Sequence, residues 1–146
     1  MDKEPQKAIS ALKEIWHKMD GAYEFYAKSQ GLNTTTVLVA QLLINSPDEV
    51  YTQKDICEKL ELPKQVVNSI VKSFWEQGFI ELREARDRRN KEIIVTQSGR
   101  DYKRKMLKPL EDAELAAWEG FSAEEITAFA KTLEKYVKNL ERILKL

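Results

Sequence analysis

The sequence has little of what catalytic and metal-binding sites usually need. Its 146 residues include one cysteine, Cys57, and one histidine, His17. One cysteine excludes a disulfide within the chain, and no residues stand at the spacing of a zinc site. The sequence also lacks a glycine-rich phosphate loop and a recognisable set of nucleophile, base and orienting group. We therefore expect no enzyme activity, no cofactor and no metal.

Long apolar runs are also missing. No stretch is long enough to cross a bilayer, and residues 1–5 lack the basic and apolar regions of a secretion signal. Hydrophobic residues make up 42% of the chain and charged residues 33%, a balance typical of a soluble globular domain. We expect one domain over residues 1–146 in the cytoplasm, with no membrane partner.

The formal net charge is zero, which does not by itself favour binding to nucleic acid. The charges are unevenly distributed, however. Residues 83–108 contain ten lysines and arginines against four acidic residues. That local excess is what a surface that binds a DNA groove requires.

Helical periodicity dominates the first part of the chain. Gly31 ends a first predicted helix, and Asn33 is a suitable N-cap for a second, which stops at Ser46-Pro47. The first helix spans about residues 6–29, where apolar residues recur three or four positions apart: Ile9, Leu12, Trp16, Met19, Tyr23 and Tyr26.

Two short helices follow, joined by a tight turn at residues 61–62. A capping box at Thr52 and Asp55 opens the first, in which Cys57 shares a side with Ile56 and Leu60 and is expected to be a buried structural thiol. The second covers about residues 63–77, and Gly78 closes it. Its predicted buried face consists of Val67, Ile70, Val71 and Phe74. This arrangement is the outline of a helix-turn-helix.

A β-hairpin is predicted at about residues 79–96, with two short apolar strands and a strongly charged tip. Thr96 can cap the next helix, which Pro109 is expected to kink or split. A capping box at Ser122 and Glu125 starts the final helix. The fold class is therefore mainly α with a small β-hairpin, a winged helix-turn-helix flanked by N- and C-terminal dimerisation helices.

The second helix of the pair has a polar side that can contact DNA. A helix fits the major groove, where glutamine and asparagine can pair with adenine, and valine can meet a thymine methyl group. Lysine and serine can contact phosphates. The candidate DNA contacts on this helix are Lys64, Gln65, Val66, Asn68, Ser69 and Lys72. An ordinary solvated helix face is the alternative reading of the same residues.

The terminal helices carry more apolar surface than the small central module can cover. They pack on each other within one chain or interlock between two chains. We favour the second arrangement, because symmetric dimers are the commonest oligomers and one helix-turn-helix covers only one half-site.

The whole chain resembles the MarR family of bacterial transcription regulators. The resemblance rests on residues 31–60, 67–71 and 76–80, and most specifically on Asp87-Arg88-Arg89 with its spacing to Thr96 and Gly99. It implies a homodimer with a DNA-binding lobe at 33–96, in which the recognition helix is about 63–77 and the wing about 79–96. Residues 5–30 and 97–146 would form the dimerisation lobe.

The same resemblance assigns roles within the wing and suggests an effector site. Asp87 would anchor the wing through a salt bridge to an arginine, Arg89 would enter the minor groove, and Arg88 would contact phosphate, with Arg86 beside them. Many family members bind small aromatic or lipophilic effectors between the two lobes. The candidates for such a crevice are Trp16, His17, Tyr23, Tyr26, Val37 and Leu38, although an aromatic stripe at helical spacing is more often core.

The sequence thus predicts a regulator of double-stranded DNA, a repressor that acts as a homodimer on a pseudo-palindromic operator and is released by a small aromatic ligand. A winged helix used only as a protein-protein interaction module is the alternative. The cations from Arg86 to Arg89 discriminate between the two, because a module that binds only protein has no evident use for clustered cations at a wing tip.

Overall fold

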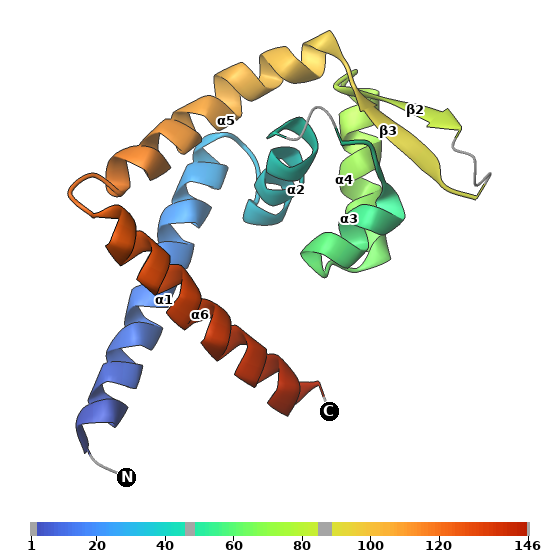
Figure 1. The fold of residues 1–146 in the computed structure, drawn as a ribbon. Helices are drawn as coiled ribbons and strands as arrows, with labels where there is room; N and C mark the ends of the chain where they lie inside the picture. The colour runs from blue at the N-terminus through green and yellow to red at the C-terminus, as the bar shows by residue number, and fades with distance from the viewer. Residues whose placement is uncertain (1–2, 46–48, 85–88, 146) are drawn as a thin grey trace. The chain divides into compact units, whose positions relative to one another are not determined.

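A computed structural model of the chain describes residues 3–45, 49–84 and 89–145 (Figure 1). The chain divides into two compact units, Met1–Leu110 and Glu111–Leu146. The first contains α1 (Lys3–Ser29), α2 (Thr34–Asn45), β1 (Tyr51–Thr52), α3 (Gln53–Leu60), α4 (Lys64–Glu76), β2 (Ile80–Glu84) and β3 (Lys91–Val95). Helix α5 (Gln97–Ala117) begins in the first unit and ends in the second, which also contains α6 (Ala123–Leu144).

The helix starts follow local side-chain signals in the sequence. The Asn33 side-chain oxygen accepts a hydrogen bond from the Thr36 amide at 2.8 Å. Thr52 and Asp55 form the predicted capping box at the start of α3, and Ser122 and Glu125 form the second one at the start of α6. Each box satisfies amide groups that the first turn of a helix leaves without partners, so these helix starts are confirmed.

Two features differ from the sequence-based expectation. The sheet has three strands in the order β1-β3-β2, because Tyr51 pairs with Ile93 in addition to the expected hairpin. Of the two effects predicted for Pro109, a kink or a split, the split is wrong, since α5 continues through that residue. Leu107 and Leu110 are buried on either side of the proline, and this burial offsets the hydrogen bond that proline cannot donate.

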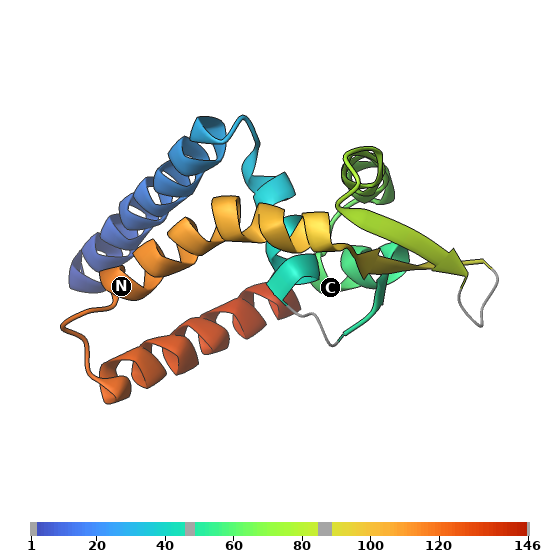
Figure 2. The same cartoon turned by 90° about the horizontal axis from the view of Figure 1, so that it is seen from above.

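The core of the first unit joins α4, the sheet and the start of α5. Val67 and Val71 of α4 are almost completely buried, as is Ile56 of α3. Phe79, just before β2, stacks on Tyr102 of α5 with ring centroids 4.2 Å apart. These contacts hold α4 beside the hairpin, and β2 and β3 project away from α3 and α4 (Figure 2).

Two helices keep apolar side chains exposed at helical spacing. Helix α6 has no buried residue. The exposed apolar residues at this spacing include Ile9, Leu12, Ile15 and Met19 on α1, and Phe129, Tyr136, Val137, Leu140, Ile143 and Leu144 on α6. None of the described helices is long and apolar enough to span a membrane.

Candidate nucleic-acid interface

Helix α4 separates a buried apolar face from an exposed polar one. Its first turn contains no acidic residue, and its only acidic residue is the last one, Glu76. The exposed residues include all six candidate DNA contacts on this helix, Lys64, Gln65, Val66, Asn68, Ser69 and Lys72. The outer face of α4 therefore carries two cations, amides and a hydroxyl without a carboxylate between them, which suits contact with phosphates and base edges.

A groove lies along the outer face of α4, and we call it the α4 groove. It has a volume of about 900 Å³ and runs between α4, the turn that follows α1 and the start of α2. The α4 residues that border it include Gln65, Val66 and Ser69. Some of the candidate DNA contacts on α4 therefore line a groove whose other wall includes the start of α2.

Of the predicted wing cations, Arg89 lies within the part of the chain that the structure describes. Arg89 is exposed just before β3. Arg86, Asp87 and Arg88 lie outside the described residues, so the predicted anchoring of the wing through Asp87 stays a prediction. The ion pair that is present joins the two strands: Arg83 donates to one oxygen of Glu92 through Nε at 3.1 Å and Nη2 at 2.6 Å. The two residues are direct partners in the β2-β3 register.

The base of the hairpin is tied to the end of α4 by Thr96. Its amide donates to the Phe79 carbonyl at 3.0 Å, and its hydroxyl donates to the Gly78 carbonyl at 2.6 Å. The same hydroxyl oxygen accepts from the Gly99 amide at 3.0 Å, which confirms Thr96 as a cap for α5. Gly99 packs so closely that an added Cβ would lie 2.3 Å from the Phe79 carbonyl oxygen.

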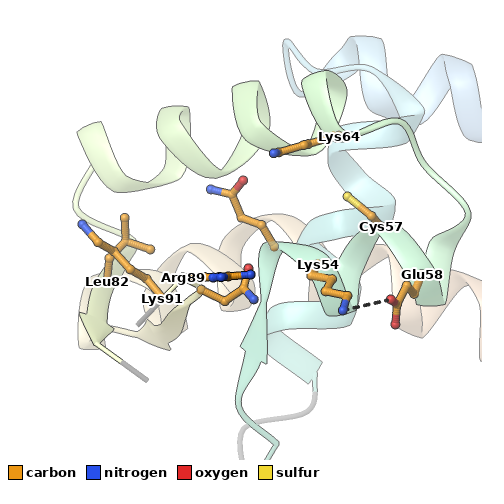
Figure 3. A pocket seen from close by; sticks show the side chains of 9 residues that line it. Lys54, Cys57, Glu58, Lys64, Leu82, Arg89 and Lys91 are labelled. Carbon is orange, nitrogen blue, oxygen red and sulfur yellow. Dashed lines mark ion pairs between the residues drawn. The ribbon is translucent and has the colours of Figure 1, made fainter. Parts of the chain in front are cut away.

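A pocket opens between α3, the first residue of α4 and the hairpin (Figure 3), and we call it the wing pocket. Its volume is about 580 Å³. Lys54 and Glu58 come from α3, Lys64 begins α4, and Arg89 and Lys91 come from the hairpin. The pocket therefore gathers two predicted DNA contacts, Lys64 and Arg89, with two lysines that were not predicted.

Cys57 also lines the wing pocket. It is half-buried, whereas Ile56 beside it is completely buried. The expectation of a buried structural thiol is therefore wrong in its burial. Adjacent helical residues point about 100° apart, so Cys57 lies at the edge of the apolar face of α3 and not at its centre.

The candidate effector residues are spread over different environments. Val37 is buried in the core, whereas Leu38 is 42% exposed. Trp16 is half-buried, and His17 and Tyr23 are exposed. Tyr26 packs against the core, and its hydroxyl donates to the Met106 carbonyl. None of the six borders the wing pocket or the α4 groove, and their role as a ligand crevice stays a prediction.

Burial perturbs two tyrosines in this part of the first unit. Loss of solvent raises the pKa of the Tyr26 hydroxyl above its usual value of 10.0. Loss of solvent also raises the pKa of Tyr102, and repulsion from Tyr26 adds to that shift. Both side chains therefore stay neutral through the physiological range of pH.

Among the described residues, no group of three or more His, Cys, Asp or Glu side chains could hold a metal ion.

Comparison with known proteins shows what the sequence and the fold are similar to. Residues 30–90 match the family model of the MarR family. A comparison with curated proteins finds no match. The resemblance predicted from the sequence is confirmed by the family match and by solved structures.

Three solved structures illustrate the likeness. NMB1585, a MarR family regulator from Neisseria meningitidis, has 24% identity and a TM-score of 0.78, over 99% of this chain and 98% of that one. MepR from S. aureus, in complex with DNA, has 18% identity and a TM-score of 0.74, over 89% and 94%. A Listeria monocytogenes regulator assigned to the MarR family, in complex with 26mer DNA, has 16% identity and a TM-score of 0.70, over 90% of this chain and 87% of that one. At these identities the likeness establishes the winged-helix fold.

Proposed function

From the MarR family match of residues 30–90 and the fold of MarR family regulators, we propose that this protein is a sequence-specific transcription regulator that binds double-stranded DNA. One observation carries the proposal. The outer face of α4 bears no carboxylate before its last residue, and its first residue, Lys64, lines the same pocket as Arg89 of the hairpin. The recognition helix and the wing thus each contribute a cation to the same pocket. Two of the similar structures are complexes with DNA.

In this proposal α4 enters the major groove and the hairpin reaches the neighbouring minor groove. Gln65 and Asn68 pair with base edges, while Lys64, Ser69 and Lys72 contact the backbone. Arg89 inserts into the minor groove, where the negative potential favours a cation. Asp87 and Arg88 keep the roles that the family resemblance implies, as wing anchor and phosphate contact.

We propose that the regulator acts as a homodimer, through residues 5–30 and 97–146. The exposed apolar stripes of α1 and α6 support this proposal, because a monomer rarely leaves such contiguous apolar surface in water. A symmetric dimer places two recognition helices about 34 Å apart, one helical turn of DNA. Multi-angle light scattering should give twice the chain mass, and Leu140→Glu should reduce that mass toward a monomer. A monomeric wild-type protein at micromolar concentration would contradict the dimer.

DNA binding is tested by fluorescence anisotropy with a pseudo-palindromic fragment from the promoter region of the protein's own gene. The logarithm of the binding constant should fall linearly with the logarithm of the salt concentration, with a slope set by the number of phosphates that the protein neutralises. Arg89→Ala should reduce affinity by about tenfold or more, since a lost base contact costs about 1–3 kcal/mol. Lys131→Ala, an exposed cation on α6, is the matched control for charge and should change affinity little.

One outcome of this experiment would overturn the proposal, and another would remove one residue from it. Affinity that is undetectable at low salt, or that does not depend on salt, favours a module that binds protein. Equal affinity of Arg89→Ala and the wild type removes Arg89 from the interface.

Repression and release by a small aromatic ligand complete the proposed function. Support comes from the aromatic and apolar side chains on α1 and α2 that one chain leaves accessible, such as Trp16, Tyr23 and Leu38. A ligand releases DNA only if it binds the DNA-free state more tightly. Titration of the protein-DNA complex with phenols and aromatic acids should lower the anisotropy, and Leu38→Ala should shift the midpoint. A panel without effect in the wild type contradicts this part of the proposal.

A further inference from the structure

The wing pocket has the size and the walls of a small-molecule site. Its volume of about 580 Å³ falls in the range of roughly 300–1,000 Å³ that is common for such sites. Leu82 of β2 and Cys57 of α3 provide apolar wall, and the remaining wall is formed largely by long polar side chains. The pocket lies where three elements meet, so its shape depends on the position of the hairpin relative to the two helices.

The charge on the pocket is strongly positive for a protein with no net charge. Among the described residues that line it, four are cations, Lys54, Lys64, Arg89 and Lys91, and one is a carboxylate, Glu58. Four minus one gives a formal charge of +3. The Glu58 carboxylate lies 4.0 Å from the Lys54 amine, and both side chains are 67% exposed, so it offsets part of this charge only weakly. A ligand with two or more negative charges would relieve the repulsion among cations from three different elements.

The start of α4 adds to the attraction for an anion. This helix has 13 residues, and its N-cap is Pro63, which makes no side-chain capping hydrogen bond. Lys64, the first helical residue, lines the pocket. The positive end of a helix favours negative charge, and here no acidic side chain in the first turn offsets it.

We propose that the wing pocket binds a phosphate group. Two sources share this chemistry: a phosphate of the DNA backbone, or a free phosphorylated small molecule of two or more negative charges. The consequence for regulation rests on the proposed function, because Lys64 and Arg89 are also proposed DNA contacts. A free phosphorylated molecule in the pocket occupies both cations and competes with DNA.

Cys57 gives this pocket a site-specific readout. It is the only cysteine in the chain, and it lines the pocket. Its rate of alkylation by the neutral reagent iodoacetamide therefore reports on this site alone. Inorganic pyrophosphate, added at constant ionic strength, should slow the reaction saturably. Lys54→Ala and Lys91→Ala should each weaken this protection by about fivefold, as expected for one partly solvated charge at contact distance, whereas Lys131→Ala should leave it unchanged.

A second measurement identifies the source of the phosphate. Operator affinity is measured over a salt series for the wild type and the same three variants. Saturable protection of Cys57, with the salt slope unchanged in Lys54→Ala and in Lys91→Ala, assigns the pocket to a free phosphorylated molecule. A salt slope that is smaller by about one in these two variants, but not in Lys131→Ala, assigns it to a DNA phosphate.

Two further results separate this proposal from the proposed function. Failure of both measurements, with the wild type still binding DNA, overturns the phosphate site and leaves the regulator. Protection of Cys57 that depends on Lys54 and Lys91, in a protein that does not bind DNA, supports the site and overturns the regulator. Circular dichroism of each variant checks that the exposed lysines can be replaced without loss of the fold.

Discussion

Gly99 allows a direct test of how the hairpin is joined to α5. In Gly99→Ala the new Cβ would lie 2.3 Å from the Phe79 carbonyl oxygen and 2.9 Å from Cγ1 of Val95. Real Cβ atoms do not approach backbone this closely, so α5 or the chain before β2 must move. Forced overpacking of this kind costs about 1–3 kcal/mol. The shift also lengthens the hydrogen bond from the Gly99 amide to Thr96, which contributes about 1 kcal/mol.

The helix propensity of alanine acts in the opposite direction. Replacing glycine by alanine inside a helix stabilises it by up to about 1 kcal/mol. The net prediction for Gly99→Ala is a loss of about 1–3 kcal/mol in the free energy of unfolding. Guanidinium denaturation followed by circular dichroism measures it, with all proteins at one concentration, because any dimer makes stability depend on concentration.

Gly21 is the matched control for this measurement. It is also a helical glycine, in α1, but an added Cβ meets nothing within 4 Å. Gly21→Ala should therefore stabilise the protein by about 0.5–1 kcal/mol. A Gly99→Ala variant that gains stability as Gly21→Ala does would refute the close approach on which the prediction rests.

Three other substitutions test separate contacts by denaturation. Tyr26→Phe removes the hydrogen bond to Met106 and should cost about 1 kcal/mol at neutral pH. Because burial raises the pKa of Tyr26 in the folded state, its contribution is complete below the usual pKa of 10.0 and is lost as pH rises through the higher folded value. The variant should thus lose less stability than the wild type in that alkaline range, and an equal loss contradicts the burial effect. Glu92→Gln breaks the ion pair with Arg83, whose side chain is 63% exposed against 30% for Glu92, and should cost about 0.5 kcal/mol in low salt and less in high salt. A cost that persists in high salt contradicts an electrostatic origin. Ser122→Ala should cost about 1 kcal/mol in the free energy of unfolding through loss of the capping box. Unchanged stability would contradict a stabilising role for this capping box.

The elements that the sequence predicted correctly depend on nearby residues. Both capping boxes, at Thr52 and Ser122, involve partners three positions away, so the pattern in the sequence is the interaction itself. The turn after α4 needs a positive φ, and Gly78 supplies it with a φ of +79°. The outer face of α4 was likewise predictable, because its period follows directly from helix geometry.

The features that were missed depend on distant residues. Strand β1 is only two residues long and exists through its pairing with β3, about forty positions later. The wing pocket joins Lys54 to Lys91 in the same way. Nothing local marks either lysine as part of a site. A search for cations that a helix-turn-helix and its hairpin bring together would have found them once the fold was assumed.

Thr96 has a mechanical consequence for any regulator built on this fold. Its backbone and side chain bind two residues that follow α4, Gly78 and Phe79, and the same hydroxyl holds the first turn of α5 through Gly99. The hydrogen bonds of Thr96 therefore couple the hairpin, the chain after α4 and the start of α5 at one junction. In the proposed regulator, we expect a rotation of α5 to move α4 and the hairpin together, so that their proposed DNA contacts are gained or lost in one step.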